Sequence, residues 1–222
     1  MLGQMAGLLK EDLCRAGYAF AKTYQPELDA VGVASALGKP MTPWEGGLVQ
    51  DLVPRSTSTP NTYSGIYGLD QFPFHTDLAH WRVPPRYLLL RCVEGQADVE
   101  TLLLDARVLA EAVPVDILRR AVFKTRRPQK GSITLLRLYQ PTATGCCFRW
   151  DDVFIRPASP MGEVAAQRIR AELAGSRPIS FALTRPGDTL LIDNWRMLHA
   201  RSQVTQSNVH RRIQRIYLEA LH

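Results

Sequence analysis

The sequence predicts a mainly β fold with flanking helices, in which short strands build a barrel or jelly roll. Two observations lead to this prediction. Apolar runs of strand length recur through the chain and fill its final third, whereas helical patterns are confined to the start and to a few inserted stretches. Because no repeat, low-complexity tract or linker-like segment divides the sequence, we expect one domain over residues 1–222.

The N-terminal region is expected to form two helices around one strand. Apolar residues recur at helical spacing over residues 3–15, and Gly17 stops that pattern ahead of a strand-like run at 18–24. A second helix is predicted at 26–37, with Gly38 as its end. These helices would flank the β structure rather than form its centre.

The middle of the chain is predicted to contain loops, strands and short helices. Residues 50–80 are rich in Ser, Thr, Pro, Asn, Gly and Tyr without helical periodicity, which indicates loops and short strands. Asp105 is placed to cap a helix. Two strands and then two helices are expected at 86–93, 100–104, 106–113 and 115–123.

The last ninety or so residues are predicted to be rich in strands. Short strands are expected within 132–155, followed by one helix at 163–173. Four more strands are expected at 179–183, 188–192, 197–201 and 211–220. A barrel of such strands, buttressed by helices, is well suited to hold a buried metal ion.

Composition indicates an ordinary folded protein of the cytoplasm. Hydrophobic residues make up 45% and charged residues 22%, and no apolar run approaches the roughly 18 residues of a membrane span. Lys10, Glu11 and Asp12 interrupt the first apolar run, which argues against an export signal. The four cysteines lack C-x-x-C spacing, so neither a zinc site nor a disulfide framework is expected.

The chain is basic, with a net charge of +6 and a pI near 9.3. Part of the excess is concentrated in one stretch without acidic residues: Arg119, Arg120, Lys124, Arg126, Arg127 and Lys130. Such a stretch can bind nucleic acid or simply form a solvated helix end and loop, and the second interpretation is favoured.

Two segments contain histidines in contexts that suggest metal binding. In PFHTDL, His75 and Asp77 are two residues apart, so an extended backbone directs both side chains to one face. In the second segment, a Pro-Gly-Asp turn and a buried strand lead to His199. Two imidazoles and one carboxylate form the facial triad that leaves open positions on Fe(II). An isolated H-x-D pair, in contrast, is more often structural.

The segments FPFHTDL and PGDTLLIDNWRMLHARS resemble the two metal-binding segments of the taurine dioxygenase-like (TauD/TfdA, clavaminate synthase-like) Fe(II)/2-oxoglutarate-dependent dioxygenases. Between them, VETLLLDARVLAEAVP resembles the threonine-containing strand and helix of that family. The resemblance spans residues 17–220 and is faint before Tyr67. It implies a double-stranded β-helix, which is a cupin-like jelly roll, with Fe(II), 2-oxoglutarate and O₂ as cofactor and co-substrates. His75, Asp77 and His199 would then hold the iron.

The same resemblance implies a binding site for 2-oxoglutarate. Thr101 matches the family's threonine, and the family's arginine follows the distal histidine in the last strand, where Arg211, Arg212 and Arg215 all stand. Strand alternation places Arg211 and Arg215 on one face and Arg212 on the other. We therefore expect Arg211 to be the main clamp and Arg215 its neighbour, with exposure on an edge strand as the alternative for each arginine.

Substrate contacts are predicted from FRWDD at 148–152, which resembles the strand after which amino-acid-oxidising relatives place a carboxylate. Asp151 would bind a cationic group of the substrate, although an ordinary loop salt bridge is the favoured interpretation. Trp81 is a second candidate and, like Trp44 and Trp150, would either line the pocket or fill the core. His80 is expected to be a hydrogen-bonded loop residue.

The predicted activity is hydroxylation, or another oxidation, of an unactivated C–H bond in a small amino-acid-like metabolite. The carboxylate of Asp77 argues against halogenation, because halogenating relatives carry a small residue there. Nucleic-acid demethylation with the same cofactor, a zinc hydrolase and a non-catalytic metal-binding barrel are the alternatives. Thr101 and the arginines disfavour the last two. The expected partner is a small molecule; nucleic acid is disfavoured, no role for a membrane is expected, and the sequence gives no signal of an oligomeric state.

Overall fold

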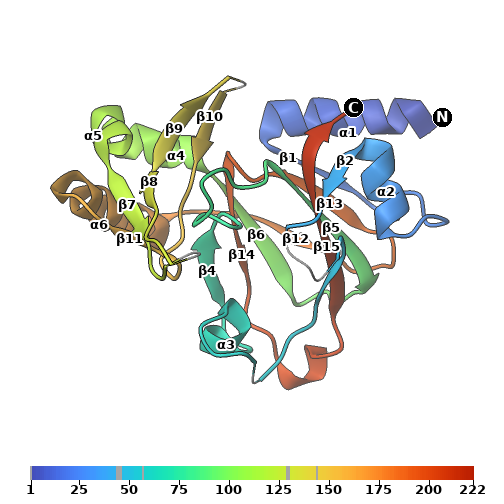
Figure 1. Ribbon diagram of the computed structural model, residues 1–222. Coiled ribbons are helices and arrows are strands. Elements are labelled where there is room, and N and C mark those ends of the chain that lie inside the picture. Colours follow the sequence, from blue (N-terminus) through green and yellow to red (C-terminus); the bar gives the residue numbers. More distant parts are fainter. Residues whose placement is uncertain (1, 44–46, 57, 129–130, 144) are drawn as a thin grey trace.

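Two antiparallel sheets face one another in the computed structural model, which describes residues 2–43, 47–56, 58–128, 131–143 and 145–222 (Figure 1). The larger sheet has the order β1-β13-β5-β15-β2, and β3 pairs with β15 beside this path. Its strands are β1 (Tyr18–Ala21), β2 (Gly38–Met41), β3 (Gln50–Leu52), β5 (Tyr87–Glu94), β13 (Thr189–Asp193) and β15 (Arg212–Leu221).

The smaller sheet has the order β12-β6-β14-β4. It contains β4 (Phe72–His75), β6 (Glu100–Asp105), β12 (Ile179–Ala182) and β14 (Met197–Arg201). A short 3₁₀ helix, η1 (Gln206–Asn208), precedes β15 in the connection that brings the chain back from β14 to the larger sheet. The strands bearing the predicted site residues therefore lie on both sides of the space between the sheets.

Alternation along the strands explains how the core is divided. In β5, Leu88 and Leu90 point toward the smaller sheet and pack with Leu103 of β6, whereas Leu89 points outward. The outward face is covered by α1 (Leu2–Ala16) and α2 (Ala30–Leu37), as Figure 1 shows. A helical layer thus shields one face of the larger sheet, and its other face remains available for the site.

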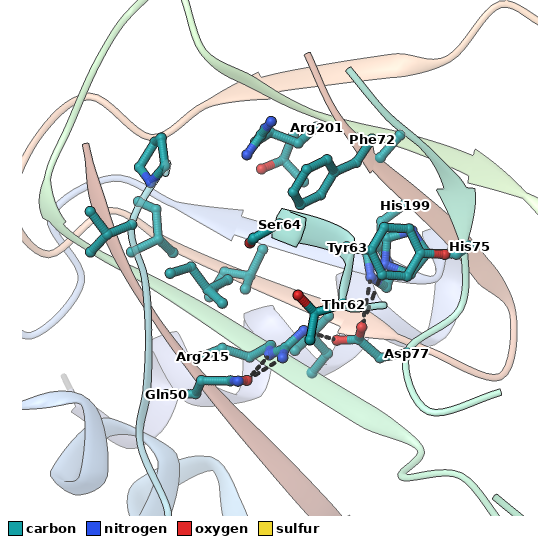
Figure 2. A pocket seen from close by; sticks show the side chains of 18 of the residues that line it. Gln50, Thr62, Tyr63, Ser64, Phe72, His75, Asp77, His199, Arg201 and Arg215 are labelled. Carbon is teal, nitrogen blue, oxygen red and sulfur yellow. Dashed lines mark hydrogen bonds and ion pairs between the residues drawn. The ribbon is translucent and has the colours of Figure 1, made fainter. Parts of the chain in front are cut away.

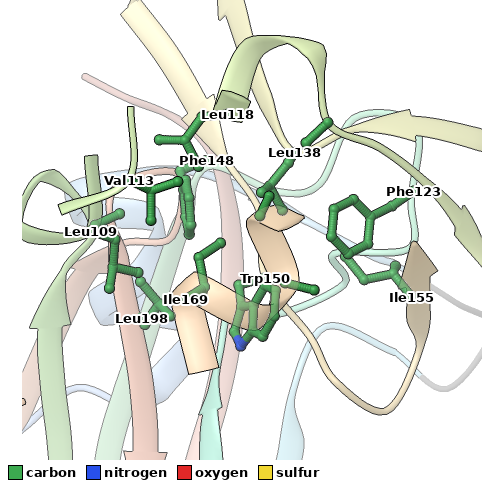
Figure 3. Close-up of a cluster of buried hydrophobic side chains, with 14 of the residues drawn as sticks. Leu109, Val113, Leu118, Phe123, Leu138, Phe148, Trp150, Ile155, Ile169 and Leu198 are labelled. Carbon is green, nitrogen blue, oxygen red and sulfur yellow. The ribbon is translucent and has the colours of Figure 1, made fainter. Parts of the chain in front are cut away.

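A third hydrophobic cluster covers the outer face of the smaller sheet (Figure 3). Leu198 of β14 packs there with Leu109, Ile169 and Trp150, and the Trp150 side chain is only 1% exposed. Truncating such a buried tryptophan costs about 3–5 kcal/mol. The cluster is built by α4 (Ala106–Ala112), α5 (Val115–Arg120), α6 (Pro160–Gly175), β7 (Val122–Thr125), β8 (Leu135–Arg137), β10 (Gly145–Phe148) and β11 (Ile155–Pro157), with β9 (Tyr139–Thr142) alongside.

Several predicted boundaries are confirmed. Helix α1 ends directly before Gly17, whose φ of 84° lies in the left-handed region that glycine tolerates. Gly187 takes a similar φ of 89° in the turn before β13. The Asp105 side chain accepts a hydrogen bond from the main-chain nitrogen of Arg107 at 3.0 Å and so caps α4 as expected.

Other boundaries differ from the predictions. Helix α2 begins at Ala30 rather than at residue 26, because Asp29 caps it by accepting a hydrogen bond from Gly32. The helix predicted at 115–123 ends at Arg120, since the next residues join β8 and β11 in a sheet. The stretch predicted as loops and strands also contains the short helix α3 (Tyr63–Tyr67).

Gly38 ends helix α2, as predicted. Its backbone is extended and begins strand β2, which pairs with β15. A Cβ atom at this position would lie 2.1 Å from the main-chain oxygen of Ala220, so the close approach of two strands requires glycine here. Pro40 is accommodated because β2 is an edge strand.

The basic stretch lies on the surface. Arg119, Arg120, Lys124, Arg126 and Arg127 are exposed, while Lys130 lies outside the described residues. No helix within the described ranges combines the length and apolarity that a membrane span requires.

Candidate metal centre and adjoining cavity

The two predicted histidine ligands are direct cross-strand neighbours. His75 ends β4 and pairs with His199 of β14, so their rings lie on the same face with centroids 4.5 Å apart. Asp77 follows β4 and points to that face, whereas Thr76 between them bonds to the main chain of Trp150 on the other side. The period of two inferred from the H-x-D spacing therefore holds.

The donor atoms converge on one point. Nε2 of His75 and Nε2 of His199 each lie 3.6 Å from Oδ1 of Asp77, and all three ligand atoms fall within 4.8 Å of one another. Nδ1 of His75 is 2.9 Å from the main-chain oxygen of Pro73. A hydrogen bond there fixes the tautomer that leaves Nε2 with a free lone pair. All three side chains are buried.

The ligand candidates differ in charge: Asp77 is ionised and His199 is neutral, whereas contact with Asp77 outweighs burial and raises the pKa of His75. Burial alone would raise the pKa of Asp77, but Arg215 and His199 hold it well below its usual range, so the carboxyl is ionised. Burial and the nearby His75 lower the pKa of His199, which favours the neutral imidazole. An ionised carboxylate and a neutral imidazole are the forms that bind metal ions.

The main chain around Asp77 is held by Asn194, a residue for which the sequence suggested no role. Asn194 is fully buried; it accepts a hydrogen bond from the nitrogen of Asp77 at 2.7 Å and donates to the oxygen of Asp77 at 3.0 Å. It also donates to the oxygen of Pro85 at 2.8 Å. Leu78 follows with a φ of 55°, an uncommon value for a side chain of this size. The turn after Asp77 is thus fixed by the segment that leads to His199.

A cavity of about 520 Å³ opens between the two sheets beside the His75–Asp77–His199 cluster (Figure 2). His75, Asp77 and His199 line it, as do the predicted Thr101, Arg211, Arg215 and Asp151. Its apolar wall comes from Leu88, Leu90 and Ile213 on the larger sheet. The predicted site residues are therefore brought into one chamber, with one exception.

The exception is Trp81. Among the described residues, the cavity wall does not include this tryptophan; its main-chain oxygen accepts a hydrogen bond from the buried Arg149. Trp150 fills the outer core, and Trp44 lies outside the described residues. Aromatic contact with the cavity comes instead from Tyr63, which precedes the first histidine motif, and from Phe72, Phe154 and Tyr217.

Arg211 is a buried guanidinium without an acidic partner. It is 4% exposed and lines the cavity; its Nε has no hydrogen-bond partner, and no ion pair to it occurs within the described ranges. The buried Arg91, by comparison, donates to main-chain oxygens including those of Tyr24 and Gln25. Burial lowers the pKa of Arg211 to about 10, so the group is still charged at neutral pH. A buried, uncompensated cation beside a cavity indicates an anionic ligand.

Arg212 points to the opposite face, as alternation predicts. It is exposed and binds Asp51 with a 2.9 Å ion pair. Arg215 shares the inner face with Arg211, but its Nη1 donates to Oδ2 of Asp77 at 2.8 Å and its Nε donates to Gln50 at 3.0 Å. The two inward arginines, Arg211 directly before β15 and Arg215 within it, therefore have different surroundings.

Thr101 lies beside a third arginine that the sequence analysis overlooked. It is 5% exposed and pairs across the sheet with Arg201, two residues beyond His199 and on the same face. Arg201 donates to the main-chain oxygens of Gly68 and Asp70 and lies 3.7 Å above the ring of Phe72. It attaches the segment before β4 to β14, and its charge adds to that of Arg211.

Asp151 is buried at the cavity wall, 2% exposed. Its Oδ1 accepts hydrogen bonds from the main-chain nitrogens of Val153 and Phe154 at 2.7 and 2.8 Å, and the Tyr63 hydroxyl lies close to the carboxylate. The loop salt bridge favoured from the sequence is formed instead by the adjacent Asp152, which pairs with Arg170 at 2.7 Å. The two neighbouring acids therefore have separate surroundings.

Two unpaired polar atoms face the cavity near Asp151. The Tyr63 ring stacks on His75 at 4.3 Å, and burial together with the nearby Asp151 charge raises the pKa of its hydroxyl, which has no hydrogen-bond partner. His80, expected to be hydrogen-bonded within a loop, instead lines the cavity with its Nδ1 unpaired. Both rings lie against Phe154, with centroids 5.6 and 5.4 Å from it.

Solved structures resemble this chain, although no protein-family model and no curated protein matches it. An asparagine oxygenase in complex with Fe(II), 2S,3S-3-hydroxyasparagine and succinate gives a TM-score of 0.75 at 18% identity, covering 98% of this chain and 78% of that one. The non-haem iron oxygenase OrfP in complex with Fe and alpha-ketoglutaric acid gives 0.74 at 17% identity, covering 97% and 79%.

PvcB of Pseudomonas aeruginosa, an Fe, alpha-ketoglutarate dependent oxygenase from an isonitrile synthetic pathway, gives a TM-score of 0.69 at 17% identity, covering 97% of this chain and 80% of that one. At these identities the likeness establishes the fold. The predicted jelly roll is thereby confirmed.

Proposed function

We propose that this protein is an Fe(II)- and 2-oxoglutarate-dependent oxygenase of the TauD/TfdA-like type. The observation that carries the proposal is the presence, in one cavity, of a His-Asp-His cluster and a buried arginine without an anionic partner. A metal-binding barrel or a zinc hydrolase needs the cluster but has no use for the arginine. An oxygenase that chelates a dicarboxylate needs both.

The residues fit both groups. His75 and His199 would offer Nε2 and Asp77 would offer Oδ1 to Fe(II), a donor set that leaves open positions on the ion. Arg211 would bind the distal carboxylate of 2-oxoglutarate through its planar fork, supported by the hydroxyl of Thr101 in the same wall. The buried charge of Arg211 would thereby gain the partner that it lacks in the protein alone.

When bound, Fe(II) and 2-oxoglutarate supply an oxidant made from dioxygen, which removes hydrogen from a substrate C–H bond as 2-oxoglutarate becomes succinate and carbon dioxide. The chain contributes positioning and shielding. Leu88, Leu90 and Ile213 line the chamber with apolar surface, and Tyr63 covers His75. A site enclosed in this way excludes bulk water from the reacting groups.

We propose that the substrate is a small amine-bearing molecule such as an amino acid, and that the reaction hydroxylates it. The carboxylate of Asp151 would pair with the cationic group, near the unpaired Tyr63 hydroxyl and His80. The asparagine oxygenase and OrfP structures contain 2S,3S-3-hydroxyasparagine and (3S)-hydroxy-L-Arg, respectively. The cavity volume suits 2-oxoglutarate together with a molecule of that size. None of the described residues of the basic stretch lines the cavity, which gives no support to a nucleic-acid substrate.

The test is succinate formation by the purified chain with Fe(II), 2-oxoglutarate and dioxygen, first alone and then with pools of amino acids and related amines. We expect slow succinate formation that one pool accelerates, together with a product heavier by one oxygen atom. A chain that binds Fe(II) but makes no succinate with or without any pool would overturn the proposal. Hydrolysis by the Zn(II)-loaded chain would instead favour the hydrolase.

A further inference from the structure

The two oxygens of the Asp77 carboxylate have different neighbours (Figure 2). Oδ1 faces Nε2 of both His75 and His199. Oδ2 points away from them and accepts two hydrogen bonds, from Nη1 of Arg215 at 2.8 Å and from the hydroxyl of Tyr217 at 2.9 Å. One oxygen is thus directed at the candidate metal position, and the other is bound by the protein.

The two donors come from one strand and are themselves held in place. Arg215 and Tyr217 are two residues apart on β15, so both side chains point into the cavity. The Arg215 guanidinium lies 5.2 Å from the centre of the Tyr217 ring and also binds Gln50, its cross-strand partner on β3. The Tyr217 side chain is 2% exposed. Neither donor can move away from Oδ2 without disturbing a packed strand.

A carboxylate can bind a metal ion through one oxygen or through both, and an oxygen acceptor has two lone pairs. At Oδ2 of Asp77 both are taken by donors, one of them charged. We infer that Arg215 and Tyr217 are positioning residues that restrict Asp77 to binding the metal through Oδ1 alone. This inference rests on the proposed function and concerns how its metal centre keeps its open positions.

The restriction matters because an octahedral ion has about six positions. Three single-atom protein ligands leave about three of these, enough for two atoms of 2-oxoglutarate and for dioxygen. If Asp77 bound the metal through both carboxylate oxygens, the second oxygen would occupy one of these positions. The two inward arginines would then differ in role: Arg211, directly before β15, would serve the co-substrate, whereas Arg215, expected from the sequence to assist it, would serve the metal ligand.

The experiment uses Mn(II) as the probe, because it binds the same oxygen and nitrogen donors and reports coordinated water by pulsed electron paramagnetic resonance in labelled water. Tyr217→Phe and Arg215→Gln are compared with the wild-type chain for the number of coordinated waters, the Kd for Mn(II) and the Kd for 2-oxoglutarate in the presence of Mn(II). Tyr217→Phe removes one oxygen atom and little volume, so its folding is not at risk.

We expect each variant to lose one coordinated water and to bind 2-oxoglutarate about tenfold more weakly, because the second oxygen of Asp77 would compete for an open position on the ion. Mn(II) affinity should be unchanged or higher, because Asp77 gains a second contact. This combination separates positioning from damage, since a damaged site loses Mn(II) affinity. Tyr24→Phe, which removes a buried hydroxyl on the far side of the larger sheet, and Arg212→Gln, on the outer face of β15, are matched controls that should keep wild-type values.

An unchanged water count in both variants would overturn the inference and leave the proposed function standing if wild-type succinate formation persists. Loss of Mn(II) binding in Tyr217→Phe would also overturn the inference. Arg215 and Tyr217 would then be needed for metal affinity itself, and not for restricting Asp77 to one metal-binding oxygen. A wild-type chain that binds no Mn(II) would contradict the proposed function itself.

Discussion

Asn194 and Asp77 are joined by a reciprocal pair of hydrogen bonds, although 117 residues separate them in the chain. The side-chain amide of Asn194 accepts a hydrogen bond from the main-chain nitrogen of Asp77 and donates one to the main-chain oxygen of Asp77. It thus makes the pair of hydrogen bonds that a residue of a neighbouring antiparallel strand would make. Because Asn194 stands at the start of the segment that leads to His199, the pair directly links the two segments that carry the proposed metal ligands. The geometry of the triad therefore depends on a residue that would bind no metal.

Replacing Asn194 with Ala should destabilise the protein and weaken metal binding together. Three buried main-chain groups lose their partner, which we expect to lower the stability by about 3 kcal/mol and the Tm by roughly 5–10 °C. Thermal unfolding with and without Mn(II) checks this, since the stabilisation by Mn(II) should shrink as well. Arg91→Met, which breaks a buried network outside the cavity, should lower the Tm but keep the Mn(II) increment.

Alanine at His75, Asp77 or His199 should abolish tight Fe(II) binding and 2-oxoglutarate turnover, because a set of three ligands has no spare member. Folding should survive in each variant. Circular dichroism, which reports the sheets and not the site, checks this. Isothermal titration with Fe(II) under anaerobic conditions and succinate detection are the measurements. Wild-type affinity and activity in any one variant would remove that residue from the ligand set.

Arg211→Ala should raise the apparent Michaelis constant for 2-oxoglutarate far more than Arg212→Ala does. Loss of a buried charge-assisted pair costs on the order of 2–5 kcal/mol, whereas Arg212 is bound to Asp51 on the outer face. Thr101→Val should have a milder effect of the same kind. Initial rates of succinate formation at varied 2-oxoglutarate provide the test, and equal effects at Arg211 and Arg212 would contradict the assignment of strand faces.

The sequence predicted those parts of the site that depend on local spacing. His75 and Asp77 share a face because an extended chain alternates, and Arg211 and Arg215 share one for the same reason. The Pro-Gly-Asp turn before His199 was readable because its residue types match its backbone. Such features need no knowledge of what lies across the sheet.

What the sequence could not predict depends on contacts between distant segments. Tyr217 meets Asp77 across 140 residues, and Arg201 bonds to main-chain oxygens more than a hundred residues earlier. No local pattern marks either contact. Contacts between distant segments also explain why helix α5 ends before the predicted residue 123. Residues 121–123 continue a helical pattern in the sequence, but Val122 pairs with Arg137 on β8 and the segment forms a strand instead.

The final prediction concerns the carboxylate of Asp151. Oδ1 holds the turn through the nitrogens of Val153 and Phe154, while the carboxylate as a whole lies at the cavity wall beside Tyr63. Asn keeps an oxygen for the turn but carries no charge, so Asp151→Asn should preserve the fold. Burial raises the pKa of this carboxyl, and a cationic substrate group would favour its ionised form.

We therefore expect Asp151→Asn to leave 2-oxoglutarate affinity and the optical spectrum of the iron complex unchanged, while succinate formation triggered by an amine-bearing substrate falls steeply. The adjacent Asp152→Asn is the matched control, because it removes an equal charge from the exposed pair with Arg170 and should leave turnover intact. Stopped-flow absorbance and succinate assays on both variants supply the comparison. If Asp151→Asn oxidises its substrate with wild-type rate and affinity, the carboxylate does not recognise a cation, and the iron ligands remain unaffected by that result.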